Sequence, residues 1–289
     1  MKLNVFAHCA IDTITIDGNN YEQIGGAACY SGITARQFKF DVDLFTKFGP
    51  DFPKQYLDEH KINLINSESQ KNTTKFAISI TGSDRTLKLE NECDPIDYSQ
   101  SDADAHLVSP IYHEISGDIF KKIKSDSNFL FVDPQGFLRR KDSQNNIFLE
   151  KTDLDLSNVN AIKVNPEESQ QIVSGTNDEM MLALQKKGVE YVLLTDKSNV
   201  SLLVKDKIYS ITLPNLRIHD TTGVGDIFCS AFTCTMLKEK DFLWALCFAG
   251  GAAQAALESN NVGLQKIPKK GTVQTNASYF YNLVKFRDL

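Results

Sequence analysis

Short apolar runs alternate with segments of helical periodicity along this chain, and the alternation restricts the possible folds more than any other feature. The strand candidates are Leu3–Ala7, Val42–Lys47, Ser101–Ser109, Phe129–Asp133, Ala161–Val164 and Val189–Thr195. Helical spacing is found at Ala27–Phe38, Ile115–Lys124, Asp178–Lys187, Ile227–Leu237 and Phe242–Ser259. Strands that alternate with helices predict an α/β fold, with a doubly wound, mostly parallel sheet covered by helices on both faces.

Two segments depart from this alternation, 13–24 and 75–90. Each predicts short strands with half-polar faces. They are too thin to form a second hydrophobic core, and no repeat or clear linker divides the chain. We therefore expect a single domain, residues 1–289, from which these strands project as a small β lid.

Charge and composition exclude several classes of function. The net charge of −6 and the pI of 5.4 argue against a nucleic-acid-binding protein, which needs a basic face. No secretory signal and no apolar run of about eighteen residues is visible, so a cytoplasmic protein without membrane association is expected. The six cysteines form no Cys-x-x-Cys pair and the histidines lack metal-ligand spacing, which predicts reduced thiols and no zinc site.

The segment Asp220-Thr-Thr-Gly-Val-Gly-Asp226 carries the strongest functional signal. Its glycines permit a tight turn, and the apolar spacing from Ile227 onward predicts a helix directly after it. Such a turn is suited to an anion, because unpaired N–H groups and the helix dipole both favour negative charge there. A carboxylate at Asp226 would compete with that anion unless it has a task, such as accepting a proton from an attacking hydroxyl. The structural alternative is an aspartate that only complements the helix dipole.

The full segment resembles the C-terminal signature of the PfkB/ribokinase family of sugar and nucleoside kinases, which usually contains Asp-Thr-x-Gly-Ala-Gly-Asp. Val224 replaces the alanine and leaves the backbone amide available. The resemblance implies a ribokinase-like fold and transfer of the γ-phosphoryl group of ATP to a hydroxyl, with Mg²⁺ as cofactor and a monovalent cation left open. It implies that Asp226 is the general base, that the amides of Gly223, Val224 and Gly225 stabilise the transferred group, and that Thr222 and Gly225 contact the nucleotide.

The N-terminal third also carries candidate binding residues: Asp12 at the end of the first strand, and the pair Gly25-Gly26 at the opening of the next helix. In open parallel sheets, ligands bind outside the carboxyl ends of the strands, so these residues should face the same crevice as Asp226. Asp12 can accept hydrogen bonds from adjacent hydroxyls of a polyol, and the glycines allow close backbone approach. Within the PfkB family they match the substrate-binding aspartate and the Gly-Gly motif near the lid hinge. An ordinary turn is the structural alternative for both.

Another candidate is the sequence Lys163-Val-Asn165-Pro-Glu-Glu168. Asn165 as N-cap, proline at the first helical position and Glu168 three residues after the cap predict a capping box. The same spacing resembles the family motif that organises magnesium, water and the nucleotide phosphates. Both interpretations can hold together, with Asn165 at the nucleotide and Glu168 as the magnesium residue, acting in part through water.

One loop departs from the family pattern, which usually contains Thr-x-Gly-x-x-Gly after the strand that here ends at Thr195. This chain has Thr195-Asp-Lys-Ser-Asn-Val200, with Lys197 and Val200 at the glycine positions. We expect Thr195 and Lys197 to border the nucleotide. The departure leaves the nucleotide preference open, and an exposed turn lysine is the alternative for Lys197.

The acceptor is less clearly encoded. Asp133-Pro-Gln135-Gly-Phe-Leu-Arg139, together with Gly-Gly-Ala-Ala-x-Tyr at 25–30, resembles the myo-inositol kinase branch of the family, which implies Gln135 and Arg139 as substrate residues. A small sugar or polyol is therefore expected, and a nucleoside remains an alternative. A non-catalytic binding relative also stays open. A Rossmann dehydrogenase would need Gly-x-Gly-x-x-Gly directly after the first strand, and this chain has none there, which argues against that class. The exposed lid strands suggest a homodimer.

Overall fold

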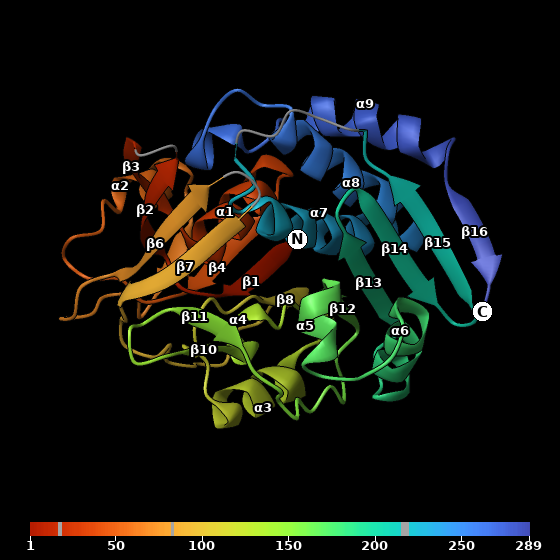
Figure 1. Ribbon diagram of the computed structural model, residues 1–289. Helices are drawn as coiled ribbons and strands as arrows, with labels where there is room; N and C mark the ends of the chain where they lie inside the picture. The colour runs from red at the N-terminus through yellow and green to blue at the C-terminus, as the bar shows by residue number, and fades with distance from the viewer. Residues whose placement is uncertain (17–18, 82–83, 215–219) are drawn as a thin grey trace.

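The structure is a computed structural model that describes residues 1–16, 19–81, 84–214 and 220–289. Its centre is a ten-stranded sheet with the strand order β16-β15-β14-β13-β12-β9-β8-β1-β4-β5 (Figure 1). The strands from β5 to β13 in this order are parallel, and β14, β15 and β16 continue the sheet in antiparallel fashion. Their bounds are β1 Lys2–Phe6, β4 Asp41–Phe45, β5 Asn63–Ile65, β8 Ala105–Val108, β9 Leu130–Val132, β12 Ala161–Val164, β13 Tyr191–Asp196, β14 Asn199–Val204, β15 Lys207–Thr212 and β16 Lys285–Asp288.

Helices cover both faces of this sheet (Figure 1). One face carries α1 Gly26–Gln37, α7 Val224–Glu239, α8 Phe242–Leu257 and α9 Lys270–Tyr281, and the other carries α3 Gly117–Asp126, α5 Pro166–Gln170 and α6 Asn177–Lys186. Successive strand residues face opposite layers, so Leu193 belongs to one buried cluster while Val192 and Leu194 belong to the other. This burial on both sides explains the continuous apolar runs of the sequence. The expected three-layer αβα arrangement is confirmed.

A second, four-stranded sheet stands apart from the main one, with the order β3-β2-β6-β7. It consists of β2 Ala10–Ile16, β3 Asn19–Gly25, β6 Thr74–Thr81 and β7 Asp84–Asn91. The predicted lid segments 13–24 and 75–90 belong to these strands, although 17–18 and 82–83 lie outside the described residues. Below we call these strands the lid sheet, and their closing movement stays a prediction.

Several other elements differ from the sequence-based expectation. The strand expected over 101–109 begins only at Ala105, because residues 101–104 are held by side-chain bonds such as that from the Lys2 amide to Asp104. Helix α7 begins at Val224, which places Asp226 inside its first turn. Neither α9 nor β16 was expected, because α9 buries only Val273, Ala277 and Phe280 of its 12 residues and β16 is exposed throughout. The short elements are α2 Gln55–Glu59, α4 Gln135–Leu138, β10 Arg139–Lys141, β11 Ile147–Leu149 and η1 Gly263–Lys266.

Within the described ranges, no helix combines the length and apolar character that a membrane crossing requires. All six cysteines are buried and free.

The topology brings polar residues to one edge of the main sheet. Strand β4 pairs with β1 on one side and β8 pairs with β1 on the other side, so the direction in which strands are added to the sheet reverses at β1. Crevices form at such a reversal of strand order, outside the carboxyl ends of the strands. Ser109, Asp133, Asn165 and Thr195 come directly after, or at the end of, β8, β9, β12 and β13. The fold therefore gathers side chains from distant parts of the sequence at this edge.

Candidate active site

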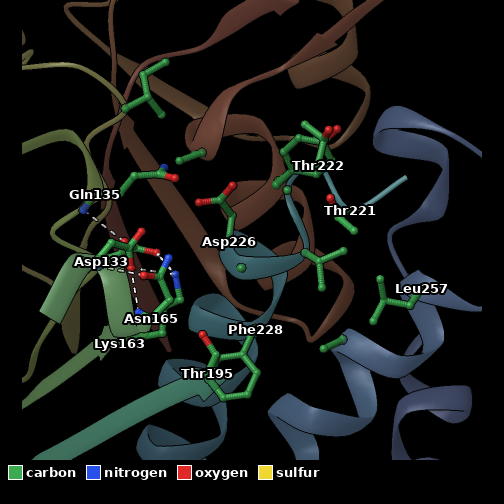
Figure 2. Close-up of a pocket in the computed structure, with 18 of the residues that line it drawn as sticks. Asp133, Gln135, Lys163, Asn165, Thr195, Thr221, Thr222, Asp226, Phe228 and Leu257 are labelled. Carbon is green, nitrogen blue, oxygen red and sulfur yellow. Dashed lines mark hydrogen bonds and ion pairs between the residues drawn. The ribbon is translucent and has the colours of Figure 1, made fainter. Parts of the chain in front are cut away.

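A cavity of about 1110 Å³ opens between the lid sheet and the carboxyl edge of the main sheet. Thirteen of the predicted residues line it together, whereas Gly25 does not: Asp12, Gly26, Gln135, Arg139, Asn165, Glu168, Thr195, Lys197, Thr222, Gly223, Val224, Gly225 and Asp226. Asp12 and Asp226 thus face one shared space. Figure 2 shows Asp226 between the group of Asp133, Lys163 and Asn165 on one side and Thr222 on the other.

The turn before α7 depends on Gly223. This residue has φ +76°, and a Cβ atom there would lie 2.4 Å from the ring of Tyr30. A side chain is therefore excluded both by backbone conformation and by the packing of α1 against α7. The turn delivers the first amides of α7, which have no partner within the helix, toward the cavity. The Val224 amide differs, since it donates to the Thr221 carbonyl at 3.3 Å.

Asp226 is held at the bottom of the cavity by Ser109, whose Oγ donates to Asp226 Oδ1 at 3.1 Å. Burial raises the pKa of Asp226 to about 7, and the negative charge of Asp133 acts in the same direction. Lys163 and the Ser109 hydrogen bond oppose this shift. A carboxyl with a pKa near neutrality can accept a proton and later release it, which suits a general base.

Lys163 neutralises the carboxylates around Asp226. Its Nζ lies 3.0 Å from Asp133 Oδ2 and 3.8 Å from Glu168 Oε2. Burial alone would lower the pKa of Lys163, but Asp133 and Glu168 raise it above its ordinary value. A Cβ atom on Gly225 would lie 3.5 Å from this Nζ, so the ammonium also borders the turn before α7.

Arg139 and Gln135 form the cavity wall near the lid sheet. Arg139 Nη2 donates to Gln135 Oε1 at 2.6 Å and Nη1 donates to the Ile111 carbonyl at 2.9 Å. The Arg139 guanidinium also lies over the ring of Phe76 in β6, 5.7 Å from its centroid. Gln135 is the first residue of the short helix α4, and these hydrogen bonds hold both side chains in place.

Gly26, the first residue of α1, allows the chain to turn from the lid sheet back into the main domain. It has φ +80°, and a Cβ atom would lie 2.4 Å from the His8 carbonyl oxygen and 2.6 Å from the Ala10 nitrogen. Both neighbours are backbone atoms that cannot move aside. We expect Gly26→Ala to lower the free energy of unfolding in urea by about 2 kcal/mol or more.

The matched control for this prediction is Gly117→Ala. Gly117 begins α3, and nothing lies within 4 Å of an added Cβ atom. This control should change stability by less than about 1 kcal/mol. Equal midpoints for the two variants would contradict the assigned packing of Gly26.

The opposite end of the cavity is mostly apolar. Its walls are formed by Val200, Leu213, Pro214, Val224, Phe228, Ala253 and Leu257. Thr195 and Lys197 lie at its rim, in the hairpin between β13 and β14. Lys197 has φ +53°, so the loop keeps a left-handed backbone where the family pattern has glycine. A flat aromatic group would fit between these walls.

Asn165 and Glu168 form the predicted capping box. The Asn165 amide donates to Glu168 Oε2 at 2.9 Å, and the Glu168 amide donates to Asn165 Oδ1 at 2.8 Å. Burial raises the pKa of Glu168, and Lys163 opposes the shift. In the part of the chain that the structure describes, no three His, Cys, Asp or Glu residues form a metal cluster. Mg²⁺ does not need such a cluster, because it is usually bound by one or two carboxylates together with substrate phosphates and water. The Glu168 carboxylate fits that kind of site.

Sequence reasoning missed Asp133, Lys163, Ser109 and Tyr30 as site residues. A signal existed for Lys163, the one charged residue of the otherwise apolar strand β12, since buried lysines are rare unless paired. Asp133 directly follows the buried strand β9, which is where ligand-facing residues are expected. Tyr30 ends the Gly-Gly-Ala-Ala-x-Tyr pattern at 25–30, but no role was assigned to it, and nothing in the local sequence identifies Ser109, whose role depends on its contact with α7.

Comparisons with known proteins agree with this architecture. The profile described as pfkB family carbohydrate kinase matches residues 11–270. No curated protein sequence is matched. Among solved structures, a pyrophosphate-dependent myo-inositol-1 kinase, converted into a myo-inositol-3 kinase by exchanging an asparagine and a serine for leucine, has a TM-score of 0.81 at 18% identity, over 96% of this chain and 99% of that chain.

Two further similar structures come from other branches. The nucleoside kinase of Methanocaldococcus jannaschii, an archaeal member of the ribokinase family, has a TM-score of 0.74 at 16% identity, over 96% of this chain and 98% of that chain. Arabidopsis thaliana ribokinase, complexed with ribose and ATP, has a TM-score of 0.73 at 16% identity, over 95% of this chain and 98% of that chain. At such identities, the likeness establishes the fold.

Proposed function

This chain belongs to the pfkB family of carbohydrate kinases, and we propose that it transfers the γ-phosphoryl group of ATP to a hydroxyl of a small polyol, with myo-inositol favoured. One observation carries the proposal. A carboxyl whose pKa is raised to about 7, that of Asp226, lies in the first turn of α7 and faces the same cavity as Asp12. A proton acceptor, an anion-binding turn and a hydroxyl-binding carboxylate are thereby combined.

In the proposed mechanism, Asp12, Gln135 and Arg139 orient the acceptor. The Asp226 carboxylate takes the hydroxyl proton while the acceptor oxygen bonds to the γ-phosphorus. The bond from this phosphorus to the bridging oxygen breaks, and the electron pair leaves with ADP. The amides of Gly225 and Asp226, at the N-terminus of α7, stabilise the charge on the transferred group.

Cations balance the phosphates in this proposal. Lys163 borders the turn through Gly225 and supplies a fixed positive charge. Mg²⁺, held near Glu168 through water and phosphate oxygens, would neutralise the donor phosphates. Asn165 fixes the Glu168 carboxylate through the capping box. Closure of the lid sheet would exclude water and limit hydrolysis of ATP.

The lid sheet also provides a basis for acceptor selection. Ile78 of β6 and Leu87 of β7 are directly paired across the strands, and both line the cavity. In the similar myo-inositol kinase, exchanging an asparagine and a serine for leucine changes the kinase from 1- to 3-specific. Ile78 and Leu87 are apolar, as are the leucines introduced into that kinase, so we propose phosphorylation of the 3-hydroxyl of myo-inositol. A nucleoside is the alternative acceptor, in line with the similar archaeal nucleoside kinase.

ATP is favoured as the donor because the far end of the cavity has apolar walls. Leu213, Val224 and Leu257 would gain little from contact with a small inorganic anion, whereas a nucleobase would bury apolar surface against them. Pyrophosphate is the second candidate donor. It is supported by the similar pyrophosphate-dependent kinase and by Lys197, which lines the cavity.

A matrix of donors and acceptors tests the function. Purified protein with Mg²⁺ is incubated with ATP or pyrophosphate and with myo-inositol, ribose, fructose, cytidine or adenosine, and donor consumption is measured. We expect consumption of ATP that depends on myo-inositol, and NMR of the product should identify the 3-phosphate. Consumption that requires a nucleoside would select the alternative acceptor. Absence of turnover with every pair would contradict the proposed function.

A further inference from the structure

Lys266 is a charged side chain in the interior that the proposed chemistry does not use. It ends η1, between α8 and α9, and its side chain is 0% exposed. It is not among the residues that line the cavity. Burial of an uncompensated ammonium is strongly unfavourable, so the fold must offer this group negative partners.

Asp220 provides these partners at the start of the anion-binding turn. Lys266 Nζ donates to Asp220 Oδ2 at 2.7 Å and to the main-chain carbonyl of the same residue at 3.1 Å. The other carboxylate oxygen, Oδ1, accepts from the Thr222 amide at 2.8 Å. The ammonium therefore fixes the carboxylate that in turn fixes the backbone of the turn.

Tyr30 connects Lys266 to the same turn by a second route. Nζ lies over the Tyr30 ring, 5.7 Å from its centroid, which is a cation–π distance. This ring packs against Gly223, since a Cβ atom there would lie 2.4 Å away. One ammonium thus contacts both supports of the turn, the carboxylate of Asp220 and the ring of Tyr30.

We propose that Lys266 is a positioning residue whose ammonium acts as a built-in monovalent cation and orders the phosphate-binding turn 220–226. Carboxylate and carbonyl oxygens are the groups that a bound cation would take as ligands, and here the Lys266 ammonium binds both kinds. The proposal rests on the proposed function, because the turn that Lys266 orders is the one assigned to the transferred phosphoryl group. It follows that activity should not depend on K⁺ or Na⁺.

The test compares two variants. Lys266→Ala leaves a cavity beside the two Asp220 oxygens that bound the ammonium, and Lys266→Met fills the same space without a charge. Lys269→Ala, which changes an exposed lysine three residues later, is the control. Activity and melting temperature are measured with K⁺, NH₄⁺ or methylammonium, against tetramethylammonium at equal ionic strength. Wild type and the control should respond less than about twofold to any of these ions. Both Lys266 variants should lose about a hundredfold in turnover, as expected when a reacting group is misplaced.

The response to added ions separates a positioning role from general damage. NH₄⁺ or K⁺ should increase the turnover of Lys266→Ala by at least about tenfold and raise its melting temperature. The turnover and melting temperature of Lys266→Met should not change with these ions. Activation of wild type by K⁺ of more than about tenfold would overturn the proposal, as would wild-type turnover in Lys266→Met. The proposal would also be overturned if neither the activity nor the melting temperature of Lys266→Ala changed on addition of NH₄⁺ or K⁺.

Two arrangements keep the result interpretable. If Lys266→Ala does not fold, two measurements still test the proposal. Activation of wild type by K⁺ of more than about tenfold, or wild-type turnover in Lys266→Met, would overturn it. If wild type proves inactive with every acceptor, the proposed function fails separately. The melting temperatures and the affinity for ATP, measured by calorimetry with the same ions, then test Lys266 by the same comparison.

Discussion

The Asp226→Asn variant is expected to turn over about 10²–10⁴-fold more slowly than wild type. Asparagine keeps the size of the side chain and can still interact with Ser109 Oγ, which lies 3.1 Å from Asp226 Oδ1. It cannot accept the hydroxyl proton. The loss should therefore appear in kcat, with the affinity for ATP, measured by calorimetry, close to that of wild type. Near-normal kcat would remove Asp226 from the role of base.

The same variant has an expected effect on stability, with a sign set by the pKa shift. Burial raises the pKa of Asp226 to about 7, so the folded protein binds this proton more tightly than the unfolded chain does. The contribution of this group to stability is present at low pH and is lost as pH rises from about 4 to about 7. Asp226→Asn should thus melt higher than wild type at about pH 8, and this gain should vanish near pH 4.

Activity should follow the ionisation of the same carboxyl. For wild type, kcat/KM is expected to rise with pH up to about 7, because only the deprotonated form can act as base. The remaining activity of Asp226→Asn should lack this rise. The two pH series together distinguish a catalytic carboxylate from one that merely complements the helix dipole.

Lys163→Met is expected to produce the second large effect. The side chain is 10% exposed and compensates Asp133 at 3.0 Å and Glu168 at 3.8 Å. Its removal takes the ion-pair partner at these distances from both buried carboxylates, which should cost about 3–5 kcal/mol in the free energy of unfolding. The pKa of Asp226 should also rise further, because Lys163 now opposes that shift. The expected result is a loss of both stability and neutral-pH activity, measured by urea unfolding and by initial rates.

Two controls accompany this prediction. Lys187→Met removes an exposed lysine that pairs with Asp153 at 3.3 Å, and should change stability by less than about 1 kcal/mol. The double variant Lys163→Met with Asp133→Asn should be more stable than Lys163→Met alone, since one uncompensated charge is removed. An additive double variant would show that the Lys163–Asp133 pair is not coupled as assigned.

Much of this architecture could be predicted from local patterns. The buried strand β12 is apolar on both faces apart from Lys163, and its four residues match the predicted strand 161–164. The turn before α7 was predictable because glycines at 223 and 225 directly precede the apolar spacing of a helix, and Gly223 has φ +76° in the structure. The capping box at Asn165 and Glu168 was predictable because it depends only on residues three apart.

The remaining features depend on contacts between distant segments. Ser109 and Asp226 are 117 positions apart, and Lys266 and Asp220 are 46 apart, so no local pattern reveals either pair. Helix α9 was missed because only three of its 12 residues are buried, Val273, Ala277 and Phe280, so its apolar stripe is thin. The packing of α9 against α8 becomes visible only in the folded chain.

The central claim is that Asp226 and the turn before α7 transfer a phosphoryl group to an acceptor held beside Asp12. The most direct measurement is ³¹P NMR of ATP and myo-inositol with wild type and with Asp226→Asn, followed in parallel. The account predicts a phosphomonoester signal that grows with wild type in step with ADP and is nearly absent with the variant. Equal growth of that signal with both proteins, or formation of ADP without any phosphomonoester, would contradict it.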